Sequence, residues 1–275
     1  MNCRKPLFAT ALVLLVAACA TSPSGRRQLM LVSEEQAISA SRRAYAQEMG
    51  RYQKEGKLVT DPHALKRVNV ITERLVAQAV KMRPDSAKWQ WSVQVIDDPK
   101  TVNAWCMAGG RMALYTGLIM KVDPTDDELA QVMGHEIAHA LANHTAERMS
   151  TAMAANAGIL AAGILSDNPG QAMAMTAAAA TVAIKLPNSR TAENEADQIG
   201  IELAARAGYD PRAAVTLWQK MGKVGGSSPP EFLSTHPSDA TRQDRLGALA
   251  PKMMPYYQAG GARPTYPVRM GPAGV

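Results

Sequence analysis

Two histidines and a glutamate within VMGHEIAHALANH, residues 132–144, have the types and spacing that metal chemistry needs. On a helix, residues four positions apart lie about 40° apart on one face, so the imidazoles of His135 and His139 can reach one ion. Zinc favours such nitrogen ligands, with one more protein ligand and an open position for water. Glu136 lies beside them and can take a proton from that water and return it to a leaving amine. The motif predicts zinc-dependent cleavage of peptide bonds, although a five-residue pattern also occurs often by chance in ordinary buried helices.

The segment around the motif predicts a well-defined, buried helix. Thr125 with Glu128 forms a capping-box pattern that starts it. Apolar side chains recur on one face and would bury the motif: Leu129, Met133, Ile137 and Ala140. On the same helical wheel, His144 falls roughly opposite His135, so we interpret it as a structural histidine and not as a ligand.

Two glutamates compete for the third ligand position in a helix predicted over about 190–207. At about 100° per residue, a buried face holds Ala196, Gly200, Leu203, Ala204 and Ala207. Glu193 falls inside this face, whereas Glu195 falls on the opposite, solvated side. A buried carboxylate is costly unless it is paired or binds metal, so Glu193 is the predicted ligand; pairing with Arg190 is the alternative. Asp197 is placed to accept a hydrogen bond from a ligand histidine.

Further helices and one small sheet frame the motif. Ser33 with Gln36 starts a helix over about 33–55, and Asp61-Pro62 starts a second that ends near Arg83-Pro84. Alternating residues in WQWSVQV predict a strand, and NAWCMA, Gly109-Gly110 and RMALYTG predict a hairpin. Asp210-Pro211 starts another helix, and the Gly/Pro-rich tail after about 255 is expected to be disordered.

Two Ala/Met-rich stretches, 151–165 and 170–186, are short for membrane spans, which need about 20 apolar residues. They predict a helical hairpin packed on the domain, and a surface that dips into lipid is the alternative.

The N-terminus has the layout of a secretory signal. Arg4 and Lys5 precede the apolar run PLFATALVLLVAA, which ends at Cys19. Val-Ala-Ala before this cysteine resembles a bacterial lipobox, in which the cysteine becomes the lipid-modified first residue. TSPSG after Cys19 suits a tether, and no Asp follows it, which favours the outer membrane. A plain signal peptide with an incidental cysteine is the alternative.

Composition agrees with export and sets limits on function. If Cys3 leaves with the signal and Cys19 carries lipid, Cys106 alone remains, so we expect no disulfide and no cysteine metal cluster. The chain has 275 residues, is 47% hydrophobic and has a formal net charge of +6 spread along its length. Without a dense basic run interleaved with aromatics, nucleic-acid binding is not expected.

Three separate motifs, GHEIAHALANHTAER, SRTAENEADQIG and STHPSDATR, resemble the HtpX and CAAX-prenyl-protease family of zinc metallopeptidases. The resemblance covers about 25–250 and is closest to the small LoiP-like periplasmic lipoproteins of this family. It implies a gluzincin fold, one Zn²⁺, and endopeptidase action on damaged or misassembled envelope proteins. The family pattern Glu-x-x-x-Asp selects Glu193 and Asp197. The integral-membrane members have several spans that this chain lacks, so prenyl-protein processing is not carried over.

The resemblance also implies roles for residues outside the helices. Asn103, Ala104 and Trp105 match an edge strand that binds the substrate backbone as one more strand; an ordinary hairpin strand is the alternative. His236 matches the histidine of a His-Pro motif and could stabilise the oxyanion of the tetrahedral intermediate; a loop histidine at a proline turn is the alternative. Arg242 matches the basic residue that follows, which implies that it supports the metal ligands, as Asp197 does, without binding the ion.

These observations predict a mostly helical α+β zincin fold with a small sheet or hairpin upstream of the active-site helix. The predicted organisation is a lipoprotein signal peptide (1–18), a lipid-anchored tether (19–32), a zinc metallopeptidase domain (33–250) and a tail (251–275). The predicted partners are protein or peptide substrates, the membrane through lipid on Cys19, and other envelope proteins. An envelope chaperone or assembly factor that keeps zinc as a structural element is the alternative function.

Overall fold

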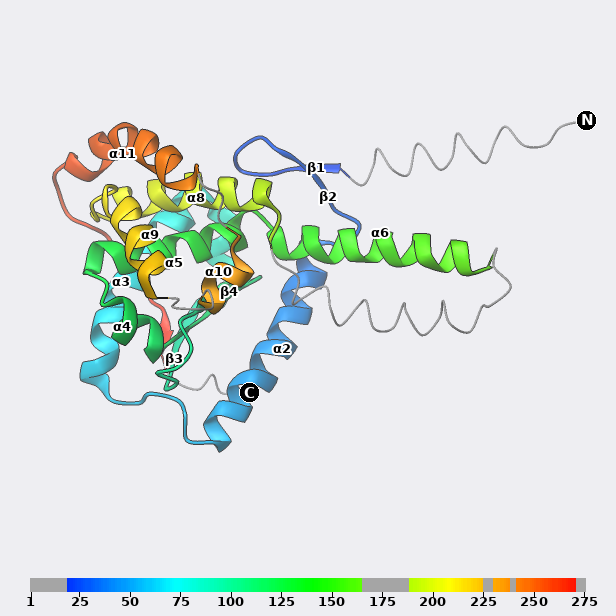
Figure 1. Cartoon of the computed structure of the whole chain (residues 1–275), viewed down its shortest axis with the longest axis horizontal. Helices are drawn as coiled ribbons and strands as arrows, with labels where there is room; N and C mark the ends of the chain where they lie inside the picture. The colour runs from blue at the N-terminus through cyan, green and yellow to red at the C-terminus, as the bar shows by residue number, and fades with distance from the viewer. Residues whose placement is uncertain (1–18, 165–187, 225–229, 238–240, 271–275) are drawn as a thin grey trace, which may run out of the picture. The chain divides into compact units, whose positions relative to one another are not determined.

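The computed structural model describes residues 19–164, 188–224, 230–237 and 241–270 (Figure 1). The chain divides into two compact units. The smaller comprises residues 1–37 and 145–186, and the larger comprises residues 38–144 and 187–275. The larger unit contains both the HEIAH motif and the predicted third ligand.

The smaller unit joins an N-terminal hairpin to a long helix. Strand β1 (Cys19–Thr21) pairs antiparallel with β2 (Arg27–Leu29), and helix α6 spans His144–Ile164. Arg26 donates two hydrogen bonds, of 2.7 and 2.6 Å, to the carboxylate of Glu147, and Gln28 donates a third of 2.9 Å. These bonds hold the hairpin to the first turns of α6.

Helices make up most of the larger unit, as predicted. Their bounds are α2 (Glu34–Lys54), α3 (Pro62–Met82), the 3-10 helix η1 (Pro84–Lys88), α4 (Thr116–Val122), α5 (Asp126–Leu141), α8 (Arg190–Arg206), α9 (Ala213–Val224), α10 (Glu231–Thr235) and α11 (Arg242–Gln258). The first residues of α2 belong to the smaller unit. The helices predicted from the two capping boxes, from Asp61-Pro62 and over 190–207 are confirmed.

A four-stranded sheet with the order β4-β5-β3-β6 completes the larger unit. β3 (Ser92–Ile96) lies parallel to β5 (Arg111–Tyr115), which pairs antiparallel with β4 (Ala104–Met107). Gly109 and Gly110 form the turn between β4 and β5 with φ of 84° and 79°, a region that favours glycine. The predicted hairpin is confirmed, and it lies just upstream of α5 in the sequence.

The Gly/Pro-rich tail 251–275 was expected to be disordered. This prediction is wrong for residues 251–270, which the structure describes as ordered. Helix α11 continues to Gln258, and β6 (Arg269–Met270) pairs parallel with β3. The backbone N–H of Tyr266 donates to the carbonyl of Glu73 at 3.0 Å. Composition did not indicate the order of the last residues because the backbone N–H groups of Tyr266 and Arg269 bond to segments about 180–190 residues earlier in the chain.

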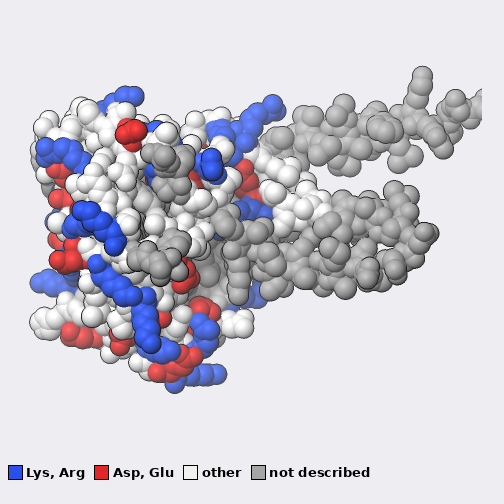
Figure 2. Space-filling model, viewed as in Figure 1, with Lys and Arg blue, Asp and Glu red and all other residues white. Residues whose placement is uncertain are grey.

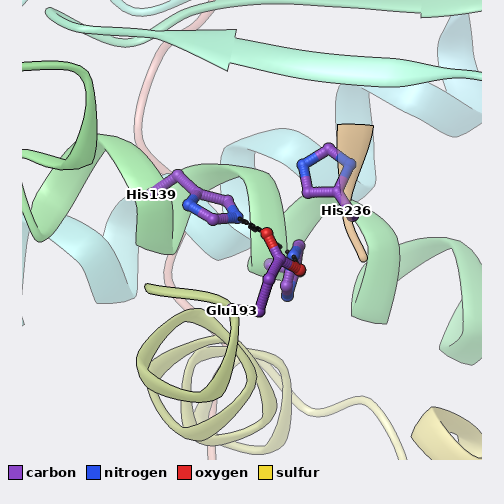
Figure 3. Close-up of side chains that lie close together, drawn as sticks. His139, Glu193 and His236 are labelled. Atoms are coloured by element: carbon purple, nitrogen blue, oxygen red, sulfur yellow. Dashed lines mark hydrogen bonds and ion pairs between the residues drawn. The ribbon is translucent and has the colours of Figure 1, made fainter. Parts of the chain in front are cut away.

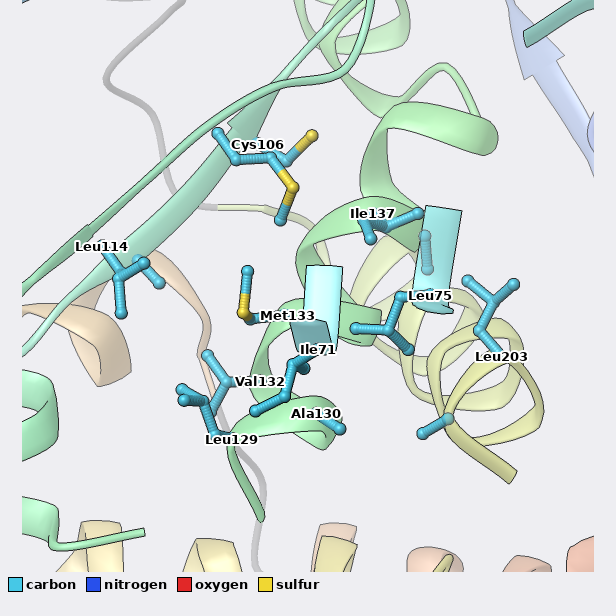
Figure 4. Close-up of a cluster of buried hydrophobic side chains, with 14 of the residues drawn as sticks. Ile71, Leu75, Cys106, Leu114, Leu129, Ala130, Val132, Met133, Ile137 and Leu203 are labelled. Atoms are coloured by element: carbon cyan, nitrogen blue, oxygen red, sulfur yellow. The ribbon is translucent and has the colours of Figure 1, made fainter. Parts of the chain in front are cut away.

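Helix α5 lies at the centre of the larger unit, where it packs against α3, α8, α9 and β4 (Figure 1). Thr125 caps its first turn through both bonds of the capping box, at 2.8 and 3.2 Å. The apolar face predicted for this helix is buried against side chains of α3, α8 and the sheet (Figure 4). Ile71 and Leu75 from α3, and Leu203 from α8, belong to this core. The HEIAH residues are therefore held on a rigid central helix.

Two glycines allow α5 and α8 to approach each other closely. A Cβ atom on Gly200 would lie 2.8 Å from the backbone nitrogen of His135, and one on Gly134 would lie 2.9 Å from the carbonyl oxygen of Gly200. Real Cβ contacts are essentially never this short, so larger residues would push the two helices apart. This close contact brings the acidic residues of α8 within reach of the histidines of α5.

Basic and acidic side chains are mixed over the face of the molecule seen in Figure 2. Among the described residues, no helix combines the length and apolar character that crossing a membrane requires. The first Ala/Met-rich stretch forms part of α6. The second, 170–186, lies outside the described residues, so the predicted helical hairpin stays a prediction.

Candidate metal centre

Four buried side chains that can bind a metal ion converge where α5 meets α8. They are His135, His139, Glu193 and His236, and their ligand atoms all lie within 4.8 Å of one another. Figure 3 shows the rings of His139 and His236 and the carboxylate of Glu193 directed toward one small region. The spacing of four residues in α5 places both motif histidines on the face that α8 covers.

Three of these side chains have the mutual distances of zinc ligands. The Nε2 atoms of His135 and His139 are 3.1 Å apart, and each lies 3.3 Å from one carboxylate oxygen of Glu193. Zinc bonds of about 2.0–2.1 Å in a tetrahedral arrangement separate neighbouring ligand atoms by about 3.3 Å. Two imidazoles and a carboxylate also form a donor set that zinc prefers. The residues present therefore fit a zinc ion.

The protonation of the three groups also suits a metal site. Burial opposes the ionisation of Glu193, but the two histidines outweigh it and hold its pKa well below the usual range. Burial lowers the pKa of His139 well below its ordinary value, which keeps this ring neutral. Burial also lowers the pKa of His135, but Glu193 and Asp197 outweigh that effect and raise it to about 9. Binding of a metal ion would displace this proton from His135.

Asp197 and Arg242 contact two of the predicted zinc ligands, His135 and Glu193. Oδ1 of Asp197 lies 3.1 Å from Nδ1 of His135, the contact predicted from the helical wheel. Arg242 donates a hydrogen bond of 2.6 Å to Asp197 and one of 3.1 Å to Glu193. Its guanidinium is 1% exposed and lies 3.6 Å from the ring centre of Trp218. A fully buried arginine therefore balances the charge of two buried carboxylates.

Glu136 and His236 face each other beside the cluster. Oε1 of Glu136 lies 3.3 Å from Nε2 of His236, and both side chains are buried. Nδ1 of His236 lies 3.1 Å from the carbonyl oxygen of Phe232, which can only accept a hydrogen bond, so Nδ1 carries the proton of the neutral ring. Burial lowers the pKa of His236 to about 3, so at neutral pH the lone pair of Nε2 is directed toward Glu136.

The residues predicted to bind substrate lie at one edge of the described sheet. Ala104 and Trp105 begin β4, and Asn103 immediately precedes it. β4 packs against α5 and pairs with β5 along one edge. The side chain of Asn103 donates a hydrogen bond of 3.2 Å to Glu231 at the start of α10. The edge strand β4 is therefore next to the motif helix α5, and the residue before β4 contacts the start of α10.

Glu195 is not where the sequence placed it. We expected it on a solvated face, but it is 4% exposed, and its Oε2 lies 3.1 Å from Nε2 of His144. The helical wheel identified the stripe of α8 that faces α5 but could not show that another segment covers the opposite side.

His144 was also misplaced, because the helical wheel was continued past the end of α5. This helix ends at Leu141, and Asn143 adopts a left-handed φ of 55°. His144 therefore does not continue the helical wheel of α5, and its Nδ1 lies only 2.7 Å from Nδ1 of His139. After glycine, asparagine is the residue that most often ends helices in this conformation, so Asn143 was the signal for the break.

Cys106, the cysteine expected to remain in the mature chain, is buried and free. Cys19 is the first residue of β1. Its proposed lipid modification stays a prediction.

Similarity to known proteins identifies the family of this chain. The pattern of Peptidase family M48 matches residues 62–250. The chain is 31% identical to the human mitochondrial metalloendopeptidase OMA1 over 245 residues, which is 84% of this chain and 45% of that protein. It is 39% identical to the Arabidopsis thaliana OMA1 over 158 residues, 57% of this chain and 31% of that protein.

A bacterial relative is the beta-barrel assembly-enhancing protease of Escherichia coli, 31% identical over 208 residues, 72% of this chain and 41% of that protein. The chain spans about a third to a half of the length of the relatives it matches. The family match includes α5 and α8, the two helices whose contact forms the cluster. The resemblance inferred from the three motifs is thus confirmed, and the chain belongs to peptidase family M48.

Proposed function

We propose that this protein is a zinc-dependent endopeptidase of the bacterial cell envelope. The main support is the geometry of His135, His139 and Glu193, whose ligand atoms have the separations of a tetrahedral zinc site. These three residues would hold one Zn²⁺. When bound, the ion supplies a Lewis acid that lowers the pKa of a water molecule to about 7 and polarises the substrate carbonyl.

Glu136 is proposed as the general base. It follows His135 directly, and burial at 2% exposure keeps bulk water away from its carboxylate. It would take a proton from the attacking water and deliver it to the nitrogen of the leaving amine. A metal site with only a structural role would not require a carboxylate at this position.

His236 is proposed to stabilise the oxyanion of the transition state. Because Nδ1 is occupied by the carbonyl of Phe232, Nε2 can donate a hydrogen bond only when the ring is protonated. Negative charge on the substrate oxygen favours that form, and Oε1 of Glu136 lies 3.3 Å from Nε2. The pair therefore has the geometry to share the one proton that Glu136 takes from water, which would pass to His236 while the oxyanion exists and return to Glu136 for delivery to the leaving amine.

The free edge of β4 is proposed to bind the substrate backbone. Within the described residues, this strand pairs with β5 on one side only, so its other edge can accept an extended peptide as an added strand. Asn103, Ala104 and Trp105 would lie along this peptide, next to the helix that holds Glu136.

The His236→Phe substitution is expected to lower turnover by about 100-fold or more, as removal of a transition-state donor does, while zinc content stays near one per chain. Phenylalanine keeps the volume of the ring and its stacking on Phe232. Steady-state kinetics and metal analysis of the same sample give the two readouts. Loss of zinc without a separate catalytic defect would instead make His236 a ligand or a residue needed for folding.

Attachment to the envelope is the second part of the proposal. The basic and apolar residues of 1–18 would form a signal peptide, and lipid on Cys19 would anchor the segment 19–32 to the periplasmic face of the outer membrane. The bacterial relatives named beta-barrel assembly-enhancing protease support envelope proteins as substrates or partners. We propose that misfolded or misassembled envelope proteins are cleaved.

Cys19→Ser is expected to release the protein from membranes, because serine has no thiol to accept the lipid. Fractionation of cells into soluble and membrane material, followed by detection of the protein, measures this change. Cys106→Ser is the matched control, and it should remain with the membranes. A Cys19→Ser protein that still sediments with membranes would show that lipid on this residue is not the anchor.

Degradation of casein with and without a metal chelator tests the proposed activity. A zinc endopeptidase loses cleavage when the metal is removed and regains it when zinc is restored. Binding of unfolded protein without any chelator-sensitive cleavage would instead support an assembly factor with a structural metal.

A further inference from the structure

A buried chain of hydrogen bonds leads from His139, in the metal cluster, through His144 to Glu195. Nδ1 of His139 lies 2.7 Å from Nδ1 of His144, and Nε2 of His144 lies 3.1 Å from Oε2 of Glu195. The two rings meet edge to face with centroids 4.9 Å apart. His144 is 1% exposed and Glu195 is 4% exposed. The chain is therefore shielded from solvent from one end to the other.

With Glu195 ionised and His144 neutral, the carboxylate at the end of this hydrogen-bond chain sets the direction of both bonds in it. An ionised Glu195 can only accept, so Nε2 of His144 is the donor. A neutral His144 then presents a lone pair at Nδ1, and Nδ1 of His139 must supply the proton of the bond between the rings. A neutral His139 with its proton on Nδ1 has its lone pair on Nε2, the atom that faces Glu193 and His135.

We propose that His144 and Glu195 are positioning residues that fix the tautomer and orientation of His139 for metal binding. This inference rests on the proposed zinc site. It gives the two ligand histidines different supports: His135 contacts the carboxylate of Asp197 directly, whereas His139 reaches a carboxylate through a second imidazole. Partners of this kind orient the ligand ring and raise its basicity, and their loss typically weakens metal binding by about 10–100-fold.

Two features of the backbone position the residues of this hydrogen-bond chain. Helix α5 ends at Leu141, and the left-handed turn at Asn143, two residues later, lets His144 meet the ring of His139 edge to face. Glu195 lies two positions after Glu193 on α8, so the same helix presents one carboxylate to the metal cluster and a second to His144. His139 and Glu195, the two ends of the hydrogen-bond chain, thus lie on α5 and α8, the helices that form the metal cluster.

Zinc affinity in three variants tests the inference. The dissociation constant is measured by competition with a chromophoric chelator for Glu195→Gln, His144→Phe and the double variant. We expect affinity to fall about tenfold for Glu195→Gln, which keeps an acceptor but loses the charge, and up to about 100-fold for His144→Phe. Because Glu195 acts through His144, the double variant should bind zinc within about twofold of His144→Phe, a non-additive result.

Glu128→Gln is the matched control for a purely structural effect. Glu128 is a buried glutamate of α5, 3% exposed, that bonds Lys220 and Thr216 away from the cluster. Its loss should lower the melting temperature of the chelator-treated protein while zinc affinity stays at the wild-type value. For Glu195→Gln we expect the reverse, with a small change in this melting temperature and a reduced stabilisation by added zinc.

The outcomes distinguish failure of the proposed metal site from failure of the positioning role alone. If the wild type binds no zinc, or if Glu193→Ala binds it as the wild type does, the proposed metal site is wrong. If the wild type binds zinc and Glu193→Ala does not, but Glu195→Gln and His144→Phe both match the wild type, the positioning role alone is overturned. Additive losses in the double variant would likewise contradict a chain that runs through His144.

Discussion

Glu136→Gln is expected to lose nearly all peptidase activity while keeping its fold and its zinc. The amide has the size of the carboxylate but cannot accept the proton of the attacking water. Acid–base catalysis of this kind typically contributes about 10²–10⁴-fold, so the rate of casein cleavage should fall by at least two orders of magnitude. Cleavage and zinc content are measured on the same purified protein.

Glu202→Gln is the control for this change. Glu202 lies on α8, pairs with Arg206 and has a partly exposed side chain, so its replacement should leave both readouts unchanged. A Glu136→Gln protein that still cleaves at a rate near that of the wild type would remove Glu136 from the mechanism. A variant that loses its zinc as well would show that the residue supports the site rather than the reaction.

Glu193→Ala is expected to remove most of the bound zinc and, with it, the activity. The substitution deletes the anionic member of the three-ligand group and leaves the Nε2 atoms of His135 and His139 without the carboxylate that lies 3.3 Å from each. It also leaves the buried guanidinium of Arg242 with one carboxylate in place of two. Metal analysis after dialysis measures the loss.

Asp197→Ala gives a graded comparison for Glu193→Ala. Asp197 contacts His135 from behind and would not touch the ion, so zinc affinity should fall by only about 10–100-fold. Full zinc occupancy in Glu193→Ala would contradict the assignment of this residue as the third ligand. Equal losses in both variants would show that the two carboxylates contribute to zinc binding in the same way.

Local periodicity was enough to predict most of the helices that form the site. The capping box at Thr125 and the apolar stripe of α5 depend on residues a few positions apart, and the structure confirms both. The same reasoning placed Glu193 on the buried face of α8 and Asp197 one turn on, where they meet the motif histidines.

Contacts between distant segments could not be predicted in this way. The burial of Glu195 depends on a turn at Asn143, some 50 residues earlier, that redirects His144. The two residues of β6 are ordered because they extend an existing sheet, which no property of the tail itself reveals. Arg242 is buried because two carboxylates on another helix require its charge, whereas its own surroundings in sequence are polar.

A zinc titration with activity measured at each step tests whether the bound metal ion is responsible for cleavage. The purified protein is stripped with a chelator, dialysed, and loaded with increasing amounts of zinc while bound metal and casein cleavage are both recorded. Cleavage is predicted to vanish in the stripped protein and to rise in proportion to bound zinc, reaching its maximum at one ion per chain. Cleavage that persists in the stripped protein, or one bound zinc without any cleavage, would contradict a zinc endopeptidase.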